Sequence, residues 1–273
     1  MMGRATVPPW QQAFTTVGTT DWVVPELVTE LSAVAIQAGE GGSCNTGGKG
    51  GNLRYVTRLT VTPGETLRFI VPAGGAGHTT SPPAPGHSLI QRNIAGTWTT
   101  IFSSAYVIGS LEGTVGGGDG GFGARGPTIM GNYGYCLNGG GGGGAGGYAG
   151  NGGRGGGLAG EAPTGGAGGG GGGGGSNLLA PADYQGRSEG WPGADGGGTG
   201  ILGQGANGAA GQNQATPSGG APGSGTPAYG QGGGGGFDDS INVKQAGRAG
   251  GQGAIRIIGG DGRMYPSFRT ANE

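Results

Sequence analysis

Residues that could perform chemistry are few in this chain and do not form a catalytic arrangement. The two histidines, His78 and His87, stand on either side of a Pro-rich stretch without Cys or carboxylate at ligand spacing, so we expect no metal site. Lys49 lies among glycines but is followed by Gly50 rather than Ser or Thr, which argues against a phosphate-binding loop. No pair of acid–base carboxylates stands out. We expect a protein that is not an enzyme and that uses no cofactor.

A second group of residues is suited to binding rather than to catalysis. Aromatic side chains with a few charges beside them are typical anchors for sugars and protein loops, because they offer a large and rigid contact area. The predicted receptor-binding residues are Tyr133, Tyr135, Asp183, Tyr184, Arg187, Trp191, Phe237, Asp238 and Asp239. Two alternatives stay open: the aromatics only pack the loops together, and the two adjacent aspartates form a solvated turn.

The composition divides the chain into two regions. Of 273 residues 79 are Gly, most of them in residues 116–253, whereas residues 1–115 are typical of a β domain. Charged residues make up 11% and the net charge is −1, which argues against nucleic-acid binding because phosphate contacts need clustered Lys and Arg. No apolar stretch is long enough to insert into a membrane, and residues 1–10 show no secretion signal.

The first region has the two-residue period of β-strands. Leu31, Ala33 and Ala35 alternate with other residues in 29–38, which predicts a half-buried strand, and Pro63-Gly64 predicts a turn. We predict an all-β, jelly-roll-like sandwich over residues 1–115, completed by a returning strand at 254–258 and followed by a tail at 259–273, with essentially no α-helix. The expected strands cover residues 12–17, 21–24, 29–38, 52–61, 65–71, 88–94, 97–102 and 105–108.

The second region, residues 116–253, has a period of three. Glycines recur at 205, 208 and 211, and Asp119, Phe122 and Arg125 are also three apart. Three residues per turn is the repeat of an extended left-handed helix, so we predict a bundle of polyglycine-II helices. A disordered linker is the alternative, but such linkers are usually solvated by Glu and Lys, which are nearly absent here. Collagen would need an unbroken Gly-X-Y register.

Six glycine-rich runs are candidates for these helices: residues 116–126, 139–157, 165–175, 193–211, 230–236 and 247–253. If each run crosses the bundle once, the connecting loops alternate between its two ends. The loops far from the sandwich are then 127–138, 176–192 and 237–246, which carry all nine predicted binding residues. The loops near the sandwich are 158–164 and 212–229, which are mostly Ala, Pro, Gly, Ser and Gln.

Three motifs occur in a defined order along the chain. They are FTTVGTTDWVVPELVTELSAVAIQAGEGG at 14–42, LTVTPGETLRFIVPAGG at 59–75 and GAIRIIGGDGRMYPS at 253–267. In this order they resemble the opening, middle and closing patterns of glycine-rich bacteriophage tail-fibre proteins. The glycine-rich region is also similar to the polyglycine-helix sandwich of T-even-type tail-fibre adhesins. Two departures are Gly259, where that family usually has Trp, and the interruption at Ser43-Cys44-Asn45.

The resemblance implies a protein of the virion, in the tail fibre or tail tip, that is made in the host cytoplasm and acts in host recognition and adsorption. Its partners would be other virion tail proteins and a host cell-surface protein or polysaccharide, with the chain either a homotrimer or a monomer on a trimeric fibre. A structural spacer without receptor contact is the main alternative. An ice-binding protein is a third, but it would need a regular ladder of small residues. The chemical diversity of the loops favours the adhesin.

Overall fold

The computed structural model describes residues 7–105, 113–126, 139–157, 161–175, 192–213, 219–220, 223, 227–236, 245–260 and 262–272. Within them the fold is all-β and contains no helix, which confirms the predicted fold class. The strands are β1 (Trp10–Phe14), β2 (Gly18–Val23), β3 (Glu30–Ile36), β4 (Leu53–Thr60), β5 (Thr66–Val71), β6 (Leu89–Ile94), β7 (Thr97–Ser103), β8 (Val115–Gly116) and β9 (Ala254–Gly259).

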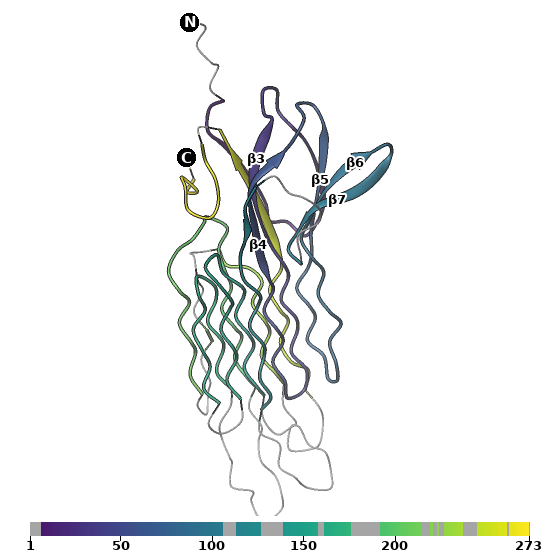
Figure 1. The fold of residues 1–273 in the computed structure, drawn as a ribbon. Coiled ribbons are helices and arrows are strands. Elements are labelled where there is room, and N and C mark those ends of the chain that lie inside the picture. Colours follow the sequence, from purple (N-terminus) through teal and green to yellow (C-terminus); the bar gives the residue numbers. More distant parts are fainter. Residues whose placement is uncertain are drawn as a thin grey trace, which may run out of the picture.

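Two antiparallel sheets form the upper part of the molecule (Figure 1). We call them sheet A, with strand order β1-β9-β3-β4-β8, and sheet B, with strand order β2-β5-β6-β7. β9, which lies near the C-terminus of the chain, pairs on one side with β1 and on the other with β3. At the turn between β4 and β5, Gly64 has a φ of 81°, a value that L side chains rarely adopt.

The main core lies between the two sheets. Phe14 of β1 stacks on Phe69 of β5 with ring centroids 3.8 Å apart, and Trp22 of β2 meets Phe69 edge-on at 6.2 Å. Strands from both sheets supply every second residue to this core. Each fully buried large apolar side chain contributes about 1.5–3 kcal/mol, so this layer holds the two sheets together.

β3 differs from the half-buried strand that its sequence predicts, and that prediction is wrong. Only its first residue is exposed, and all the others are buried. One face of the strand belongs to the core between the sheets. On the other face, Val34 and Ile36 pack with Tyr148, Ile201 and Tyr265, which come from the glycine-rich region and the C-terminal tail. Alternation within one strand cannot predict a cover that comes from more than 100 positions away along the chain.

Below the sheets, the chain continues as extended segments that hydrogen-bond at every third residue. β3 and β4 run on into residues 37–52, where Gln37 N donates to Asn52 O and Glu40 N donates to Lys49 O, both at 2.8 Å. A β ladder would repeat every second residue. Residues 72–78 and the glycine-rich segments after β8 lie alongside in the same manner (Figure 1). We call the described residues of 37–52, 72–78 and 117–253 the glycine body.

The segment 139–147 lies in the middle of the glycine body. The N–H groups of Gly142, Gly143 and Gly144 donate to three different neighbouring segments, at 2.9, 2.9 and 2.8 Å. Six segments surround it: residues 45–51, 153–156 and 194–197 accept its hydrogen bonds, and residues 121–124, 170–173 and 232–235 donate to it. Three residues per turn would distribute N–H groups in this way. That each segment is a polyglycine-II helix stays a prediction.

Side chains have no room in the middle of the body. A Cβ atom on Gly144 would lie 1.9 Å from Gly170 O, and one on Gly143 would lie 1.9 Å from Gly121 O. Both distances are far shorter than any van der Waals contact, and the opposing atoms are backbone atoms that cannot turn away. The lateral hydrogen bonds of the body therefore require glycine at these positions.

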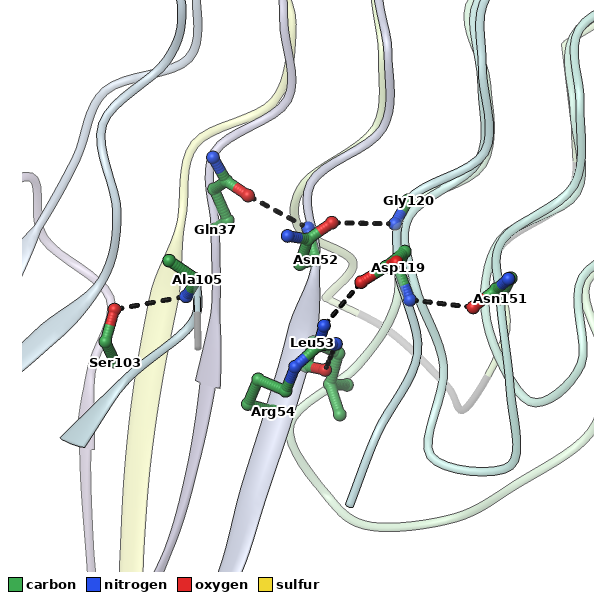
Figure 2. A network of polar contacts seen from close by, with 9 residues as sticks. All are labelled: Gln37, Asn52, Leu53, Arg54, Ser103, Ala105, Asp119, Gly120 and Asn151. Atoms are coloured by element: carbon green, nitrogen blue, oxygen red, sulfur yellow. Dashed lines mark hydrogen bonds and ion pairs between the residues drawn. The ribbon is translucent and has the colours of Figure 1, made fainter. Parts of the chain in front are cut away.

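At the edge of the body, side-chain oxygens take the place of a missing neighbouring segment. Figure 2 shows the place where β4 meets the body: Asn52 Oδ1 accepts from Gly120 N at 3.0 Å, and Asn151 Oδ1 accepts from Asp119 N at 2.9 Å. Arg54 forms an ion pair with Asp119 beside them and lowers the pKa of that carboxyl. These contacts satisfy N–H groups that would otherwise face solvent at the transition from strand to glycine segment.

We predict that Gly144→Ala lowers the free energy of unfolding by at least the ~1–3 kcal/mol of overpacking, because its Cβ would overlap a backbone oxygen. Chemical denaturation measures the change. The matched control is Gly219→Ala, whose Cβ would lie 3.3 Å from Asp195 O and needs only a small adjustment. Equal stability of the two variants would contradict the close packing described above.

Candidate functional site

The nine predicted binding residues all lie outside the described residues: Tyr133, Tyr135, Asp183, Tyr184, Arg187, Trp191, Phe237, Asp238 and Asp239. The structure shows instead where the glycine body holds the residues on either side of the loops that carry them. Those flanking residues decide at which end of the molecule a binding site made of these loops would lie.

The flanking residues meet at the end of the body that is far from the sheets. Gly126 N and Gly140 N, on the two sides of 127–138, both donate to Asn45 O, at 2.7 and 3.1 Å. Asn45 lies at the tip of the segment 37–52, where it turns back. Gly235 N, just before 237–244, donates to Gly140 O at 2.8 Å.

The remaining loops begin and end at the same place. Gly175 N, before residues 176–191, donates to Asn213 Oδ1 at 2.7 Å, and Asn213 directly precedes residues 214–218. Gly157 N donates to Glu161 O at 3.1 Å across residues 158–160. The described neighbours of 127–138, 158–160, 176–191, 214–218 and 237–244 are therefore at one end, which we call the far end. The predicted loop 212–229 begins at this end, at Asn213, but Tyr229 lies at the sheet end, where it packs with Val34 and Ile36.

The prediction that each of the six runs crosses the body once is wrong. The run 139–157 turns back at Tyr148, where Gly147 N donates to Gly150 O at 2.9 Å. The run 165–175 is bent at 167–169, and the run 193–211 is bent at 201–204. Residues 161 and 213, which we expected near the sandwich, consequently lie at the far end.

Apolar residues inside glycine-rich runs are the sequence signal that could have shown these turns. Tyr148 and Ile201 are buried against the outer face of sheet A. The Tyr148 ring stacks between those of Tyr55 and Tyr265, with centroids 6.0 and 5.9 Å away. A large side chain cannot be buried inside the tightly packed body, so a buried one marks the sheet end of a turn. Phe122, which also lies in a glycine-rich run, is 68% exposed instead.

Charges near the far end are paired but weakly held. Arg154 contacts Glu161 at 3.1 Å and Arg248 contacts Asp195 at 3.5 Å, with all four side chains 40–55% exposed. Exposed ion pairs contribute only about 0–1 kcal/mol, so these pairs do not hold the body together. Asp195 has a second contact, since its Oδ1 accepts from Gly234 N at 2.8 Å.

Two kinds of site find no support in the part of the chain that the structure describes. No group of three or more His, Cys, Asp or Glu residues could hold a metal ion there. No helix there is long and apolar enough to cross a membrane. Nδ1 of the His78 ring lies 3.1 Å from the hydroxyl oxygen of Thr80.

Arg256 of β9 fixes the sheet end of the body. Its side chain is 1% exposed, and the guanidinium donates to Tyr265 Oη at 2.9 Å, Thr270 O at 2.6 Å and Gln11 Oε1 at 2.8 Å. Tyr265 Oη in turn donates to Ile201 O at 2.7 Å. These acceptors are neutral, and hydrogen bonds to a charged donor contribute about 1.5–3 kcal/mol each. One cation thus joins β1, β9, the C-terminal tail and a turn of the glycine body.

A family described as a glycine-rich domain matches residues 15–258. The chain belongs to this family. None of the curated proteins compared with the chain matches it. The matched part begins just after β1 and ends within β9, so it includes sheet B, the glycine body and all of sheet A except β1 and the last residue of β9.

Gly259 stands where the glycine-rich tail-fibre proteins that this chain resembles usually have Trp, and the structure offers a physical reason for the glycine. Trp10 of β1 pairs directly with Gly259 of β9, and a Cβ on Gly259 would lie 2.6 Å from Trp10 Cζ2. The indole ring of Trp10 thus covers the glycine from the neighbouring strand, as aromatic residues often do for glycines in sheets. A Trp at 259 and a Trp at 10 could not share this space.

We predict that Arg256→Met destabilises the glycine-rich domain by more than ~3 kcal/mol, because it leaves several buried acceptors without a donor. Urea denaturation measures the loss. Arg248→Met is the control: it removes an exposed arginine and is expected to cost at most ~1 kcal/mol. A loss of similar size for both variants would be incompatible with the role assigned to Arg256.

The buried tyrosines make stability depend on pH in the alkaline range. Burial raises the pKa of Tyr265 to about 12 and that of Tyr148 well above the usual 10.0. As pH rises above 10, the unfolded chain loses these protons first. The free energy of unfolding is therefore complete below about pH 10 and falls between about pH 10 and 12, by up to ~1.4 kcal/mol per pH unit for each tyrosine. Between about pH 10 and 12, the free energy of unfolding measured by denaturation should fall less steeply with pH for Tyr265→Phe than for the unaltered protein. An equally steep fall in both proteins would refute the raised pKa of Tyr265.

Proposed function

We propose that this glycine-rich domain is a bacteriophage tail-fibre or tail-tip protein of the virion, made in the host cytoplasm, that acts in recognition of the host surface and in adsorption. It is not an enzyme and needs no cofactor in this role. Its partners are other virion tail proteins on one side and a host cell-surface protein or polysaccharide on the other. It assembles as a homotrimer or as a monomer on a trimeric fibre.

The convergence of loop-flanking residues at the far end carries this proposal. Segments 127–138, 176–191 and 237–244 hold the nine predicted binding residues, and the body anchors both sides of each segment within one small area. Binding residues on loops held by a rigid scaffold are a common arrangement in recognition proteins. The sheets lie at the opposite end (Figure 1), which leaves the far end as a free tip. The three motifs that resemble glycine-rich tail-fibre proteins support the same role.

The sequence of the loops separates an adhesin from a spacer. Segments 176–191 and 237–244 contain aromatic and charged residues, and 127–138 contains two tyrosines, whereas 214–218 (QATPS) contains neither kind. A spacer makes no receptor contact at its free end, so its function does not require chemically diverse loops there. An adhesin needs such diversity to match its receptor, because aromatic anchors contribute most of the binding energy at interfaces.

We predict that replacing 176–191 by a Gly-Ser linker of equal length lowers the adsorption rate of an infectious phage at least tenfold while virions still assemble. The same replacement at 214–218 is the matched control, since it alters the same end without removing aromatic or charged residues. Phage adsorption kinetics and electron microscopy of the virions are the measurements. Unchanged adsorption after replacement of 127–138, 176–191 and 237–244 together would leave only the role of a structural spacer.

A further inference from the structure

The outer face of sheet B carries an ordered row of polar side chains that the tip loops do not involve. Asp21 of β2 pairs with Arg68 of β5, Arg68 pairs with Gln91 of β6, and Gln91 pairs with Thr100 of β7. The four residues therefore form one straight row across all four strands. Their neighbours along the strands, such as Phe69, point into the core instead.

Side-chain contacts hold this row in a defined geometry. Arg68 donates to both carboxylate oxygens of Asp21, from Nε at 2.7 Å and from a terminal nitrogen at 2.9 Å. Gln91 Nε2 donates to Thr100 Oγ1 at 3.3 Å. The guanidinium of Arg68 also lies 3.8 Å from the ring centroid of Trp98 on β7. A guanidinium that is fixed on two sides loses little conformational freedom when a ligand binds.

The row remains open to solvent. The side chains of Asp21 and Arg68 are 45% and 28% exposed, and Trp98 is half-buried. Val23, two residues after Asp21 on the same face of β2, is 59% exposed. The main core lies on the other face of sheet B, so the row faces away from the core.

The chemistry of the row fits one class of ligand. The opposite charges of Asp21 and Arg68 neutralise each other, so the row does not favour an anion or a cation. It offers fixed donors and acceptors side by side, next to the half-buried indole ring of Trp98, one face of which lies against the guanidinium of Arg68. A pyranose has the complementary properties: adjacent hydroxyl groups that both donate and accept, and an apolar face of C–H groups that packs on an aromatic ring. The centre of a protein–protein interface is depleted in charged residues, whereas the charged pair of Asp21 and Arg68 lies within this row.

We propose that the outer face of sheet B binds a neutral carbohydrate, with a sugar ring against Trp98 and its hydroxyl groups on Asp21, Arg68 and Gln91. This second site lies on the sheets, away from the far end of the glycine body. It is independent of the loops to which host recognition is assigned above.

The experiment is a glycan array probed with the full-length protein, containing neutral hexoses, deoxyhexoses, N-acetylhexosamines and their oligomers, followed by calorimetric titration with the strongest hit. We expect Trp98→Ala and Asp21→Asn each to weaken binding at least tenfold. Thr99→Ala is the matched control, because Thr99 is exposed on the same strand but next to the row rather than in it. It should bind like the unaltered protein.

The outcomes separate this site from the tip. If a variant with 127–138, 176–191 and 237–244 replaced by linkers keeps glycan binding, the sheet site is supported whatever the loops do in adsorption. Loss of binding in that variant but not in Trp98→Ala would place the sugar at the tip and overturn the proposal. Absence of any glycan signal for the unaltered protein would overturn it as well. If Trp98→Ala fails to fold, Asp21→Asn decides alone, since it preserves the shape of the side chain.

Discussion

The fold depends on backbone hydrogen bonds between extended segments that approach one another more closely than any side chain allows. In the middle of the glycine body each N–H group points to a different neighbour from the one before it, so one segment binds six others. A single such segment gains little, because ordering glycine costs about 1–2 kcal/mol per residue and a hydrogen bond returns about 0.5–1.5 kcal/mol. The arrangement is therefore stable only as a complete bundle, in which each segment satisfies the others.

The sheets start and close this bundle. β3 and β4 run directly into residues 37–52, so the first two segments of the body inherit their position from a packed β core. At the end of the chain β9 returns between β1 and β3, and Arg256 ties the C-terminal tail and the turn at Ile201 to sheet A. Glycine segments with no side chains cannot select their own neighbours by apolar packing. The sheet end, where Tyr148 and Tyr265 stack, supplies that selection.

Local patterns predict β3 to β7 and β9 to within two residues at either end, but they shift β1 and β2 by up to three residues and miss β8. They do not show how the parts of the molecule cover one another. Alternation and the Pro63-Gly64 turn place β4 and β5 within one residue at either end. The double burial of β3 depends on Tyr148 and Tyr265, which no pattern near β3 contains. The turns at Tyr148 and Ile201 were missed because a three-residue period looks alike in both directions of the chain. With those turns, residues 161 and 213, on the two loops that sequence analysis placed near the sandwich, lie at the far end, whereas Tyr229, at the end of the second loop, lies at the sheets. The nine predicted binding residues themselves stay a prediction.

Amide hydrogen exchange of the intact protein tests the central claim most directly. If lateral hydrogen bonds hold the glycine body together, the amides of 139–147 and 170–173 should exchange many-fold more slowly than those of residues 206 and 207, which are exposed. The protection should disappear in one cooperative step as denaturant is added. Exchange across 139–147 at the rate of an unfolded chain, in a protein whose sheets remain protected, would contradict the account.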